Sequence, residues 1–399
     1  MWESLLLPCM PMHDLQEAAP ATPILDSGVL PPVRRGKRAV GVVIGACIGI
    51  VFAVVINNVG SLGPQPGLAL LFYFTILGLV VTIHELGHLA AGWIVGFHFS
   101  LISIGPFTLK IQYGRLNVQL RRDLGAIGYA GMHIETVKKA RRSLLTFVAA
   151  GPGANLLSGA LAVLFAYFAA PTSRDSWLLP FAAGFSALSF IMAVLSLIPY
   201  DRSDGARLWM LLNSREGTRR WIASCALGSQ QRKGIRPKNW KRSWMKAACS
   251  IRDGRLDELN SNLLAYVAAS DRKDAVAAAA YLERSLDLAH YPHPAQRDFI
   301  AREASYFCAW FRDDSPLAER WLSQIRRPKL TTQLLHVRTG IALDCARHNF
   351  DSALAGCKKG AEFIGRLPDS KMKPLLQDSW QEWTEEIQQR QNQMVTTQV

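Results

Sequence analysis

The stretch Pro66–Phe97, PGLALLFYFTILGLVVTIHELGHLAAGWIVGF, decides the fold. It is longer than the roughly 20 apolar residues that a helix needs to cross a hydrocarbon core of about 30 Å. Its only acidic, basic or imidazole side chains are those of His84, Glu85 and His88, which fall within five positions. Because charged or titratable groups inside an apolar span are costly, they indicate a functional site by default. The stretch therefore predicts a transmembrane helix that carries a site.

The spacing of these three side chains is typical of a metal site. Residues four apart lie on one face of a helix, so His84 and His88 can bind one ion while Glu85 stays beside it. Zinc bound in this way lowers the pKa of its water towards about 7, and a neighbouring carboxylate can act as general base. Two incidental histidines on a surface helix are the alternative, and the apolar surroundings disfavour it. We predict His84 and His88 as Zn²⁺ ligands and Glu85 as the catalytic base.

Three further uncharged stretches predict spans at residues 39–57, 143–170 and 177–199. With residues 66–97 they make about four transmembrane helices, and buried helices of a large soluble core are the alternative. The predicted fold class is therefore mainly α, a polytopic membrane protein. Its predicted parts are a flexible basic tail over 1–38, a transmembrane metalloprotease domain over 39–212 with its core at 66–212, and a basic juxtamembrane linker over 213–254.

Basic residues near the spans predict the orientation, since they favour the cytoplasmic side. Four of them precede the first span, and the loop after the second span is rich in them, so both termini are expected in the cytoplasm. The net charge of +14 follows largely from this bias and from basic residues after the last span. These features favour membrane lipid rather than nucleic acid as a partner. The basic residues that set the orientation are Arg34, Arg35, Lys37, Arg38, Lys110, Arg115, Arg121, Arg122, Lys138, Lys139, Arg141 and Arg142.

A third metal ligand is expected at the end of the last span, because a catalytic zinc usually takes three protein ligands. At about 1.5 Å per residue, His84 lies roughly 27 Å along an inward-running helix, near the cytoplasmic side. The last predicted span also runs inward, and Asp201 and Asp204 follow its end. We predict Asp204 as the third ligand, with Asp201 the weaker candidate. A loop in which either aspartate faces water is the alternative.

Three motifs together resemble the site-2 protease family of intramembrane zinc metalloproteases. They are HELGH at residues 84–88, GPGAN at 151–155, and SLIP at 196–199 followed by Asp204-Gly205. The resemblance covers approximately residues 66–212 and implies that Asp204 completes the zinc site. It also implies that Asn155 lies near the substrate, together with Ser196. Ser196 departs from the family pattern, which has asparagine there, and its shorter side chain alters any substrate contact.

Short stretches with strand character lie between the second and third spans, at residues 99–104, 106–112 and 116–120. In the family, a small sheet at this place can present an edge to the substrate, and an ordinary cytoplasmic hairpin is the alternative. His98 and His133 also lie in this region. Neither has ligand spacing to the pair on the helix, so both are predicted to be non-ligands.

The C-terminal part predicts a soluble α-helical domain over residues 255–387. Its clearest helical pairs are 298–311 with 316–325, and 332–347 with 350–366. These pairs resemble a tetratricopeptide-like array that binds a peptide or protein partner, and a plain helical bundle is the alternative. Residues 388–399 are predicted to be disordered.

The sequence therefore predicts a zinc-dependent intramembrane endopeptidase that hydrolyses a peptide bond in or near a transmembrane segment of a membrane protein. The non-catalytic alternative is a membrane scaffold with a helical partner-binding domain and a vestigial metal site. The short loops and the family resemblance favour a bacterial inner membrane, and an organelle membrane is the alternative.

Overall fold

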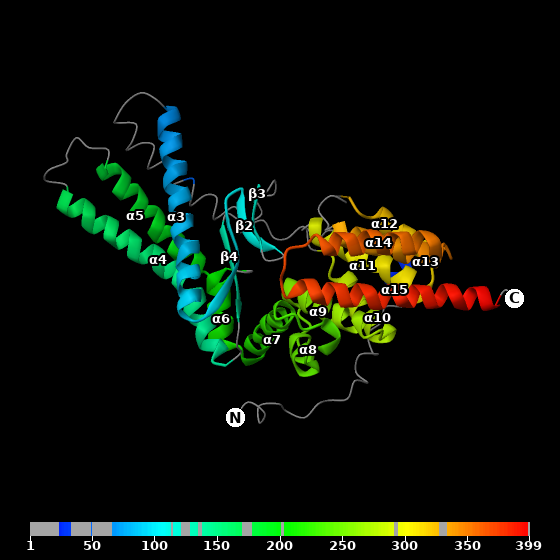
Figure 1. The fold of residues 1–399 in the computed structure, drawn as a ribbon. Helices are drawn as coiled ribbons and strands as arrows, with labels where there is room; N and C mark the ends of the chain where they lie inside the picture. Colours follow the sequence, from blue (N-terminus) through cyan, green and yellow to red (C-terminus); the bar gives the residue numbers. More distant parts are fainter. Residues whose placement is uncertain are drawn as a thin grey trace. The chain divides into compact units, whose positions relative to one another are not determined.

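A computed structural model describes the fold of most of the chain. The described residues are 24–32, 49, 66–112, 115–120, 128–134, 138–169, 178–200, 203–290, 294–326 and 333–397. They form fourteen α-helices and one antiparallel sheet. The chain divides into two compact units (Figure 1). We call Gly36–Ser229 the membrane unit, and Met1–Arg35 together with Gln230–Val399 the helical unit.

Three long apolar helices make up the core of the membrane unit. They are α3 (Pro66–Ile94), α4 (Ala140–Ala169) and α5 (Leu178–Leu197), and each is long and apolar enough to cross a membrane. Three of the predicted spans are thereby found as helices. The fourth, at residues 39–57, lies outside the described residues except for residue 49.

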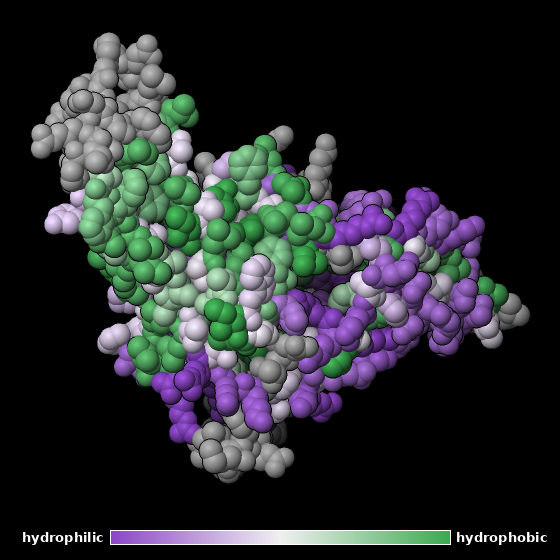
Figure 2. Space-filling view, turned by 60° about the vertical axis from the view of Figure 1, so that its left-hand side comes forward, coloured by the Kyte–Doolittle hydropathy of each residue, from purple (hydrophilic) through white to green (hydrophobic). Residues whose placement is uncertain are grey.

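The surface of these helices is apolar, as expected for contact with lipid. Large hydrophobic side chains such as Leu157, Tyr167 and Phe168 are exposed on α4. Figure 2 shows a broad hydrophobic surface over the membrane unit and a mainly hydrophilic surface over the helical unit. Such an exposed apolar surface marks a membrane or interaction site, and its extent over three helices favours lipid.

A close approach of α3 and α4 brings the HELGH and GPGAN motifs together. A Cβ atom on Gly87 would lie 2.6 Å from the carbonyl oxygen of Ala150 and 2.6 Å from the Cβ atom of Ala154. Small residues at such a crossing let two transmembrane backbones pack closely. The glycine within HELGH is therefore required by packing.

A four-stranded antiparallel sheet connects α3 to α4, in the order β3-β2-β1-β4. Its strands are β1 (Phe97–Ile104), β2 (Phe107–Gln112), β3 (Arg115–Leu120) and β4 (Gly128–Ile134). The first three match the predicted strand stretches. β4 was not predicted, because its sequence GYAGMHI has two glycines and few of the β-branched residues that mark a strand. Pairing with β1 along its whole length stabilises it instead.

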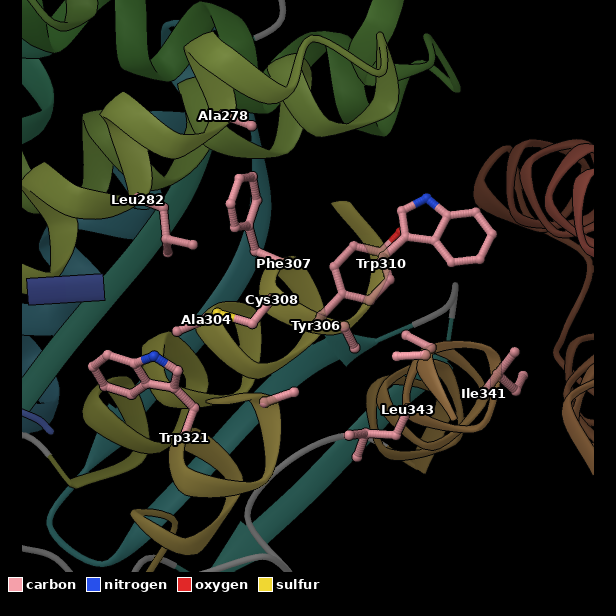
Figure 3. Packing of buried hydrophobic residues seen from close by; sticks show 14 of the residues in the cluster. Ala278, Leu282, Ala304, Tyr306, Phe307, Cys308, Trp310, Trp321, Ile341 and Leu343 are labelled. Carbon is pink, nitrogen blue, oxygen red and sulfur yellow. The ribbon is translucent and has the colours of Figure 1, made fainter. Parts of the chain in front are cut away.

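Helices α6 (Asp204–Asn213) and α7 (Arg215–Arg232) follow α5, and the rest of the helical unit that the structure describes is helical. Its core joins side chains of α10, α11 and α13 (Figure 3). The helices of this unit after α7 are η3 (Pro237–Asn239), α8 (Arg242–Ala248), α9 (Leu256–Asp271), α10 (Ala275–Asp287), α11 (Pro294–Arg312), α12 (Ser315–Ser323), α13 (Gln333–Ala346), α14 (Phe350–Gly365) and α15 (Met372–Thr397).

Three helical hairpins of this unit share one type of connection. In each, a residue with positive φ precedes an aspartate or asparagine whose side chain caps the second helix. Such a side chain accepts a hydrogen bond from a backbone N–H of the first turn, which ends the preceding helix and starts the next. The repeated connection supports an array of hairpins, and its tetratricopeptide-like character remains a prediction. The connecting pairs are Lys273-Asp274, Asp313-Asp314 and His348-Asn349.

Both predicted terminal tails contain helix. The short helix α1 (Ile24–Ser27) lies within the predicted flexible tail. α15 continues to Thr397, through most of the stretch predicted to be disordered. The prediction of disorder rested on the polar composition, which does not reveal the contacts that stabilise this helix. The guanidinium of Arg390 lies 3.9 Å from the ring centroid of Trp310. Gln391 donates a hydrogen bond to Asp351.

Candidate metal centre

The two histidines of α3 lie one helical turn apart and face the same point. Their ring centroids are 4.9 Å apart, with an angle of 84° between the ring planes. His84, Glu85 and His88 are 4%, 4% and 6% exposed, so all three are buried inside the membrane unit. The motif thus forms a buried cluster, and two surface histidines are excluded.

Asp204, the first residue of α6, reaches both histidines. Its Oδ2 atom lies 3.0 Å from Nε2 of His84, and its Oδ1 atom lies 3.5 Å from Nε2 of His88. One ligand atom from each of the three residues lies within 4.8 Å of the others. The structure therefore brings together the three residues predicted as ligands, although 116 positions separate Asp204 from His88.

Ser203 fixes the start of α6 and was not predicted as a site residue. Its hydroxyl donates a hydrogen bond of 2.6 Å to the carbonyl of Ile198 and accepts one of 3.1 Å from the backbone N–H of Ala206. It is the N-cap of α6 and also joins this helix to the end of α5. A serine immediately before an acidic helix start is a capping signal that the sequence offered.

Gly205 allows α6 to begin directly against α5. A Cβ atom at this position would lie 1.9 Å from the carbonyl oxygen of Leu197. No side chain can occupy that space unless the backbone moves. The Asp-Gly pair therefore combines a predicted ligand with the residue that permits its position.

The Asp204 carboxyl group is charged at neutral pH. Burial tends to raise its pKa, but the contacts with His84 and His88 outweigh burial and lower the pKa to about 2. A deprotonated carboxylate is the form that binds a metal ion.

Helix α4 holds both imidazole rings from the side opposite Asp204. Nδ1 of His88 donates a hydrogen bond of 2.7 Å to the carbonyl of Phe147. Nδ2 of Asn155 lies 3.1 Å from Nδ1 of His84. Metal-binding histidines commonly make such a contact through the ring nitrogen that does not face the metal, which fixes the orientation of the ring. The carbonyl of Phe147 could not be identified from sequence, because every residue carries one.

Asn155 is fully buried, with 0% exposure. The resemblance implies that it lies near the substrate, whereas the structure places its amide against His84. Its Oδ1 atom has no hydrogen-bond partner among the described residues. The amide therefore has one unused acceptor within the cluster.

Two glycines make room for the reactive side chains. A Cβ atom on Gly151 of α4 would lie 2.3 Å from Nε2 of His88, and one on Gly128 of β4 would lie 2.3 Å from Oε1 of Glu85. Because Gly151 in the GPGAN motif has no side chain, the imidazole of His88 can occupy the space beside it. β4 lies directly beside the predicted base.

Ser196, His98 and His133 are not part of the cluster. The hydroxyl of Ser196 donates a hydrogen bond of 3.0 Å to the carbonyl of Ala193 in its own helix. Asp201 lies outside the described residues. His98 and His133 are register partners between β1 and β4. In the part of the chain that the structure describes, His84, His88 and Asp204 form the one group able to hold a metal ion.

The residues present fit a catalytic zinc ion. Two imidazole nitrogens and one carboxylate oxygen are a ligand set of the type that leaves a fourth position for water or substrate. The amide of Asn155 and the carbonyl of Phe147 contact the outer ring nitrogens of the two histidines, as the neighbours of metal-binding histidines commonly do. The cluster is therefore a candidate metal centre.

Comparison with known proteins supports this assignment. Residues 72–177 match the model of Peptidase family M50. This is the site-2 protease family, so the resemblance found in the motifs is confirmed over that segment. No curated protein and no solved structure matches the chain.

The M50 match implies a membrane metalloprotease, in agreement with the apolar helices. The matched segment contains HELGH and GPGAN and ends before Asp204. The position of Asp204 beside the histidines is consequently independent of the match.

We expect Gly151→Ala to weaken metal binding, because the added methyl group occupies the place of the His88 imidazole. Gly153→Ala is the matched control, since a Cβ atom there meets no other atom within 4 Å. Zinc content per chain of the detergent-purified variants measures the effect. Equal zinc in both variants would show that His88 does not depend on the space at Gly151.

Proposed function

We propose that this protein is a zinc-dependent intramembrane endopeptidase that hydrolyses a peptide bond in or near a transmembrane segment of a membrane protein. The observation that carries the proposal is the cluster of His84, His88 and Asp204, with the carboxylate of Glu85 beside it. A zinc ion held there would act as a Lewis acid towards water and the substrate carbonyl.

Glu85 is proposed to move the protons of the reaction. Its carboxylate accepts a proton from the attacking water and then donates it to the nitrogen of the leaving amine. Its burial keeps bulk water away from the carboxylate, which strengthens electrostatic interactions in the site. A scaffold with a vestigial metal site would have no use for this buried carboxylate.

The sheet offers a way to hold an unwound substrate. β4 is an edge strand, and its first residue, Gly128, lies against Glu85. We propose that an extended substrate segment pairs with β4, the outer strand of the described sheet, because a peptide can add to a sheet edge as a further strand. The other edge, β3, exposes Leu116, Val118 and Leu120, which favours contact with the membrane over water.

Asn155 is proposed to position His84. When Nε2 of His84 binds a cation, its ring proton is on Nδ1 and must be donated. Rotation of the Asn155 amide by half a turn presents Oδ1, the unused acceptor, to that proton. A buried partner of this kind fixes the tautomer and the ring orientation.

Both ends of the chain are proposed to lie on the cytoplasmic side. Residues 24–32 pack against helices of the helical unit, so these two parts lie on one side of the membrane. Three crossing helices lie between them, and an even number of crossings is required. The predicted span at residues 39–57, which lies outside the described residues, would supply the fourth.

We expect Asp204→Ala to lose the zinc ion, while Glu85→Gln keeps it and lowers cleavage at least about hundredfold. Glutamine preserves the shape of the side chain but cannot accept the proton. Zinc per chain is measured on purified protein, and cleavage on a panel of single-span reporter proteins in the same membrane. Zinc retained by Asp204→Ala contradicts the ligand assignment, and cleavage retained by Glu85→Gln contradicts the role of the base.

We expect Asn155→Leu to weaken zinc affinity by about 10–100-fold, because His84 loses its orienting contact. Asn155→Asp should keep tight binding, since a carboxylate also accepts the Nδ1 proton. Competition with a metal chelator measures both variants. Unchanged zinc affinity in Asn155→Leu, with a raised KM, would instead support the substrate contact implied by the family resemblance.

We expect peptide tags on both ends of the chain to resist protease added outside intact cells and to be digested after the membrane is opened. An even number of crossings with cytoplasmic ends requires this result. Digestion of one tag in intact cells would show an odd number of crossings.

A further inference from the structure

Residues 24–32, ILDSGVLPP, belong to the helical unit although more than 240 positions separate them in the sequence from α10, the first of the helices that they contact. The segment forms one helical turn, α1, which ends at Gly28 with φ of +67°. It contacts α10, α11 and α12. We call this segment the docking segment.

Side chains of the helical unit contact the main chain of the docking segment. The carboxylate of Glu283 accepts hydrogen bonds from the backbone N–H groups of Ile24 and Leu25, the latter at 2.8 Å. Nε1 of Trp321 donates one of 2.8 Å to the carbonyl of Leu25, and Nη2 of Arg297 donates one of 2.7 Å to the carbonyl of Pro31. These contacts provide hydrogen-bond partners for main-chain groups at both the start and the end of the segment.

Three side-chain positions of the docking segment are selected by their surroundings. Leu25 is 1% exposed and belongs to the hydrophobic core of the helical unit. Asp26 forms an exposed ion pair with Arg312. Gly28 has positive φ, and a Cβ atom there would lie 3.0 Å from the Cβ atom of Arg320. The site therefore selects leucine, then an acidic residue, then glycine two positions later.

We propose that the face formed by α10, α11 and α12 is a peptide-binding site, and that residues 24–32 are its resident ligand. The contacts are those of peptide recognition: one buried apolar anchor, paired main-chain groups and a rim ion pair. Ile24 and Leu30 pack against the same core while remaining partly exposed, whereas Val29 faces away and is 56% exposed. One anchor gives modest intrinsic affinity, and the covalent connection compensates by holding the segment at high effective concentration.

The site would accept a second peptide with the same Leu-Asp-x-Gly pattern from another protein on the same side of the membrane. Such a peptide would displace the docking segment from the helical unit. The chain that follows the segment leads to α3, which carries His84, Glu85 and His88. The segment that occupies this site is therefore joined through the chain to α3, the helix that carries the proposed catalytic residues.

The test uses the full-length protein in detergent, with a specific protease site inserted after Pro32. After cleavage and gel filtration, a fluorescent peptide of residues 20–34 is added and its anisotropy is followed. We expect saturable binding to the cleaved protein, and at least about tenfold weaker apparent binding to the uncleaved protein, where the resident segment competes. Neither zinc nor the proposed peptidase activity of this protein enters this measurement, so its failure leaves the proposed function untouched.

Peptide variants test the selection rules. Leu25→Asp should weaken binding at least about tenfold, because the apolar anchor is lost. Gly28→Ala should also weaken it, through both the positive φ and the contact with Arg320. Val29→Ala is the matched control and should bind as the unchanged peptide does. Asp26→Arg should bind better to the Arg312→Glu protein than to the unchanged protein.

Three results would overturn the proposal. The cleaved protein could retain its own segment through gel filtration and refuse the labelled peptide, or lose its helical circular dichroism when the segment leaves; either makes residues 24–32 a fixed part of the core. Equal binding of the unchanged and Leu25→Asp peptides would show that the site does not select leucine at this position.

Discussion

Three ionisable side chains inside an apolar transmembrane helix are the constraint on which the membrane unit depends. Within lipid, each must find partners inside the protein. The carbonyl of Phe147, the amide of Asn155 and the carboxylate of Asp204 meet the two imidazoles. These partners come from α4 and α6, so satisfying the histidines requires α3 and α4 to pack closely and α6 to begin at the end of α5. In this part of the fold, the close packing of the helices and the pairing of the two histidines with polar partners therefore depend on each other.

Glycine is the residue through which the sequence meets this requirement. Gly87, Gly151 and Gly205 each face an atom that a methyl group would displace. This explains why the motifs pair a functional residue with a glycine. HELGH contains one between its histidines, GPGAN begins with one, and Asp204 is followed by one. Each glycine lets a helix approach to the distance at which the adjacent polar side chain can reach its partner.

The sequence predicted those features that depend on local pattern. Three spans, three strands and the helical hairpins were accessible, because length, apolar runs and spacing determine them. The grouping of His84, His88 and Asp204 was accessible too, and their role as metal ligands stays a prediction. Asp204 was accessible because span directions place it at the depth of His84. β4 was missed, since two glycines weaken its strand signal and only pairing with β1 reveals it. The contacts of Asn155 and of the Phe147 carbonyl with the histidines were missed for a different reason. The local sequence pattern does not indicate a partner that lies 71 positions away, as Asn155 does from His84. Nor does it indicate which backbone carbonyl a side chain will contact.

The predicted flexible tail shows how a contact can override composition. Residues 24–32 are rich in proline and small residues, and by themselves they cannot bury enough apolar surface to order. Leu25 orders them by entering a core that α10 to α12 already provide, and Trp321 and Glu283 satisfy its main-chain groups. The helical unit is then joined to the membrane unit at two places, through α7 and through the docking segment. Because Leu25 is the only fully buried apolar side chain among residues 24–32, this second connection is the one that a competing peptide could open.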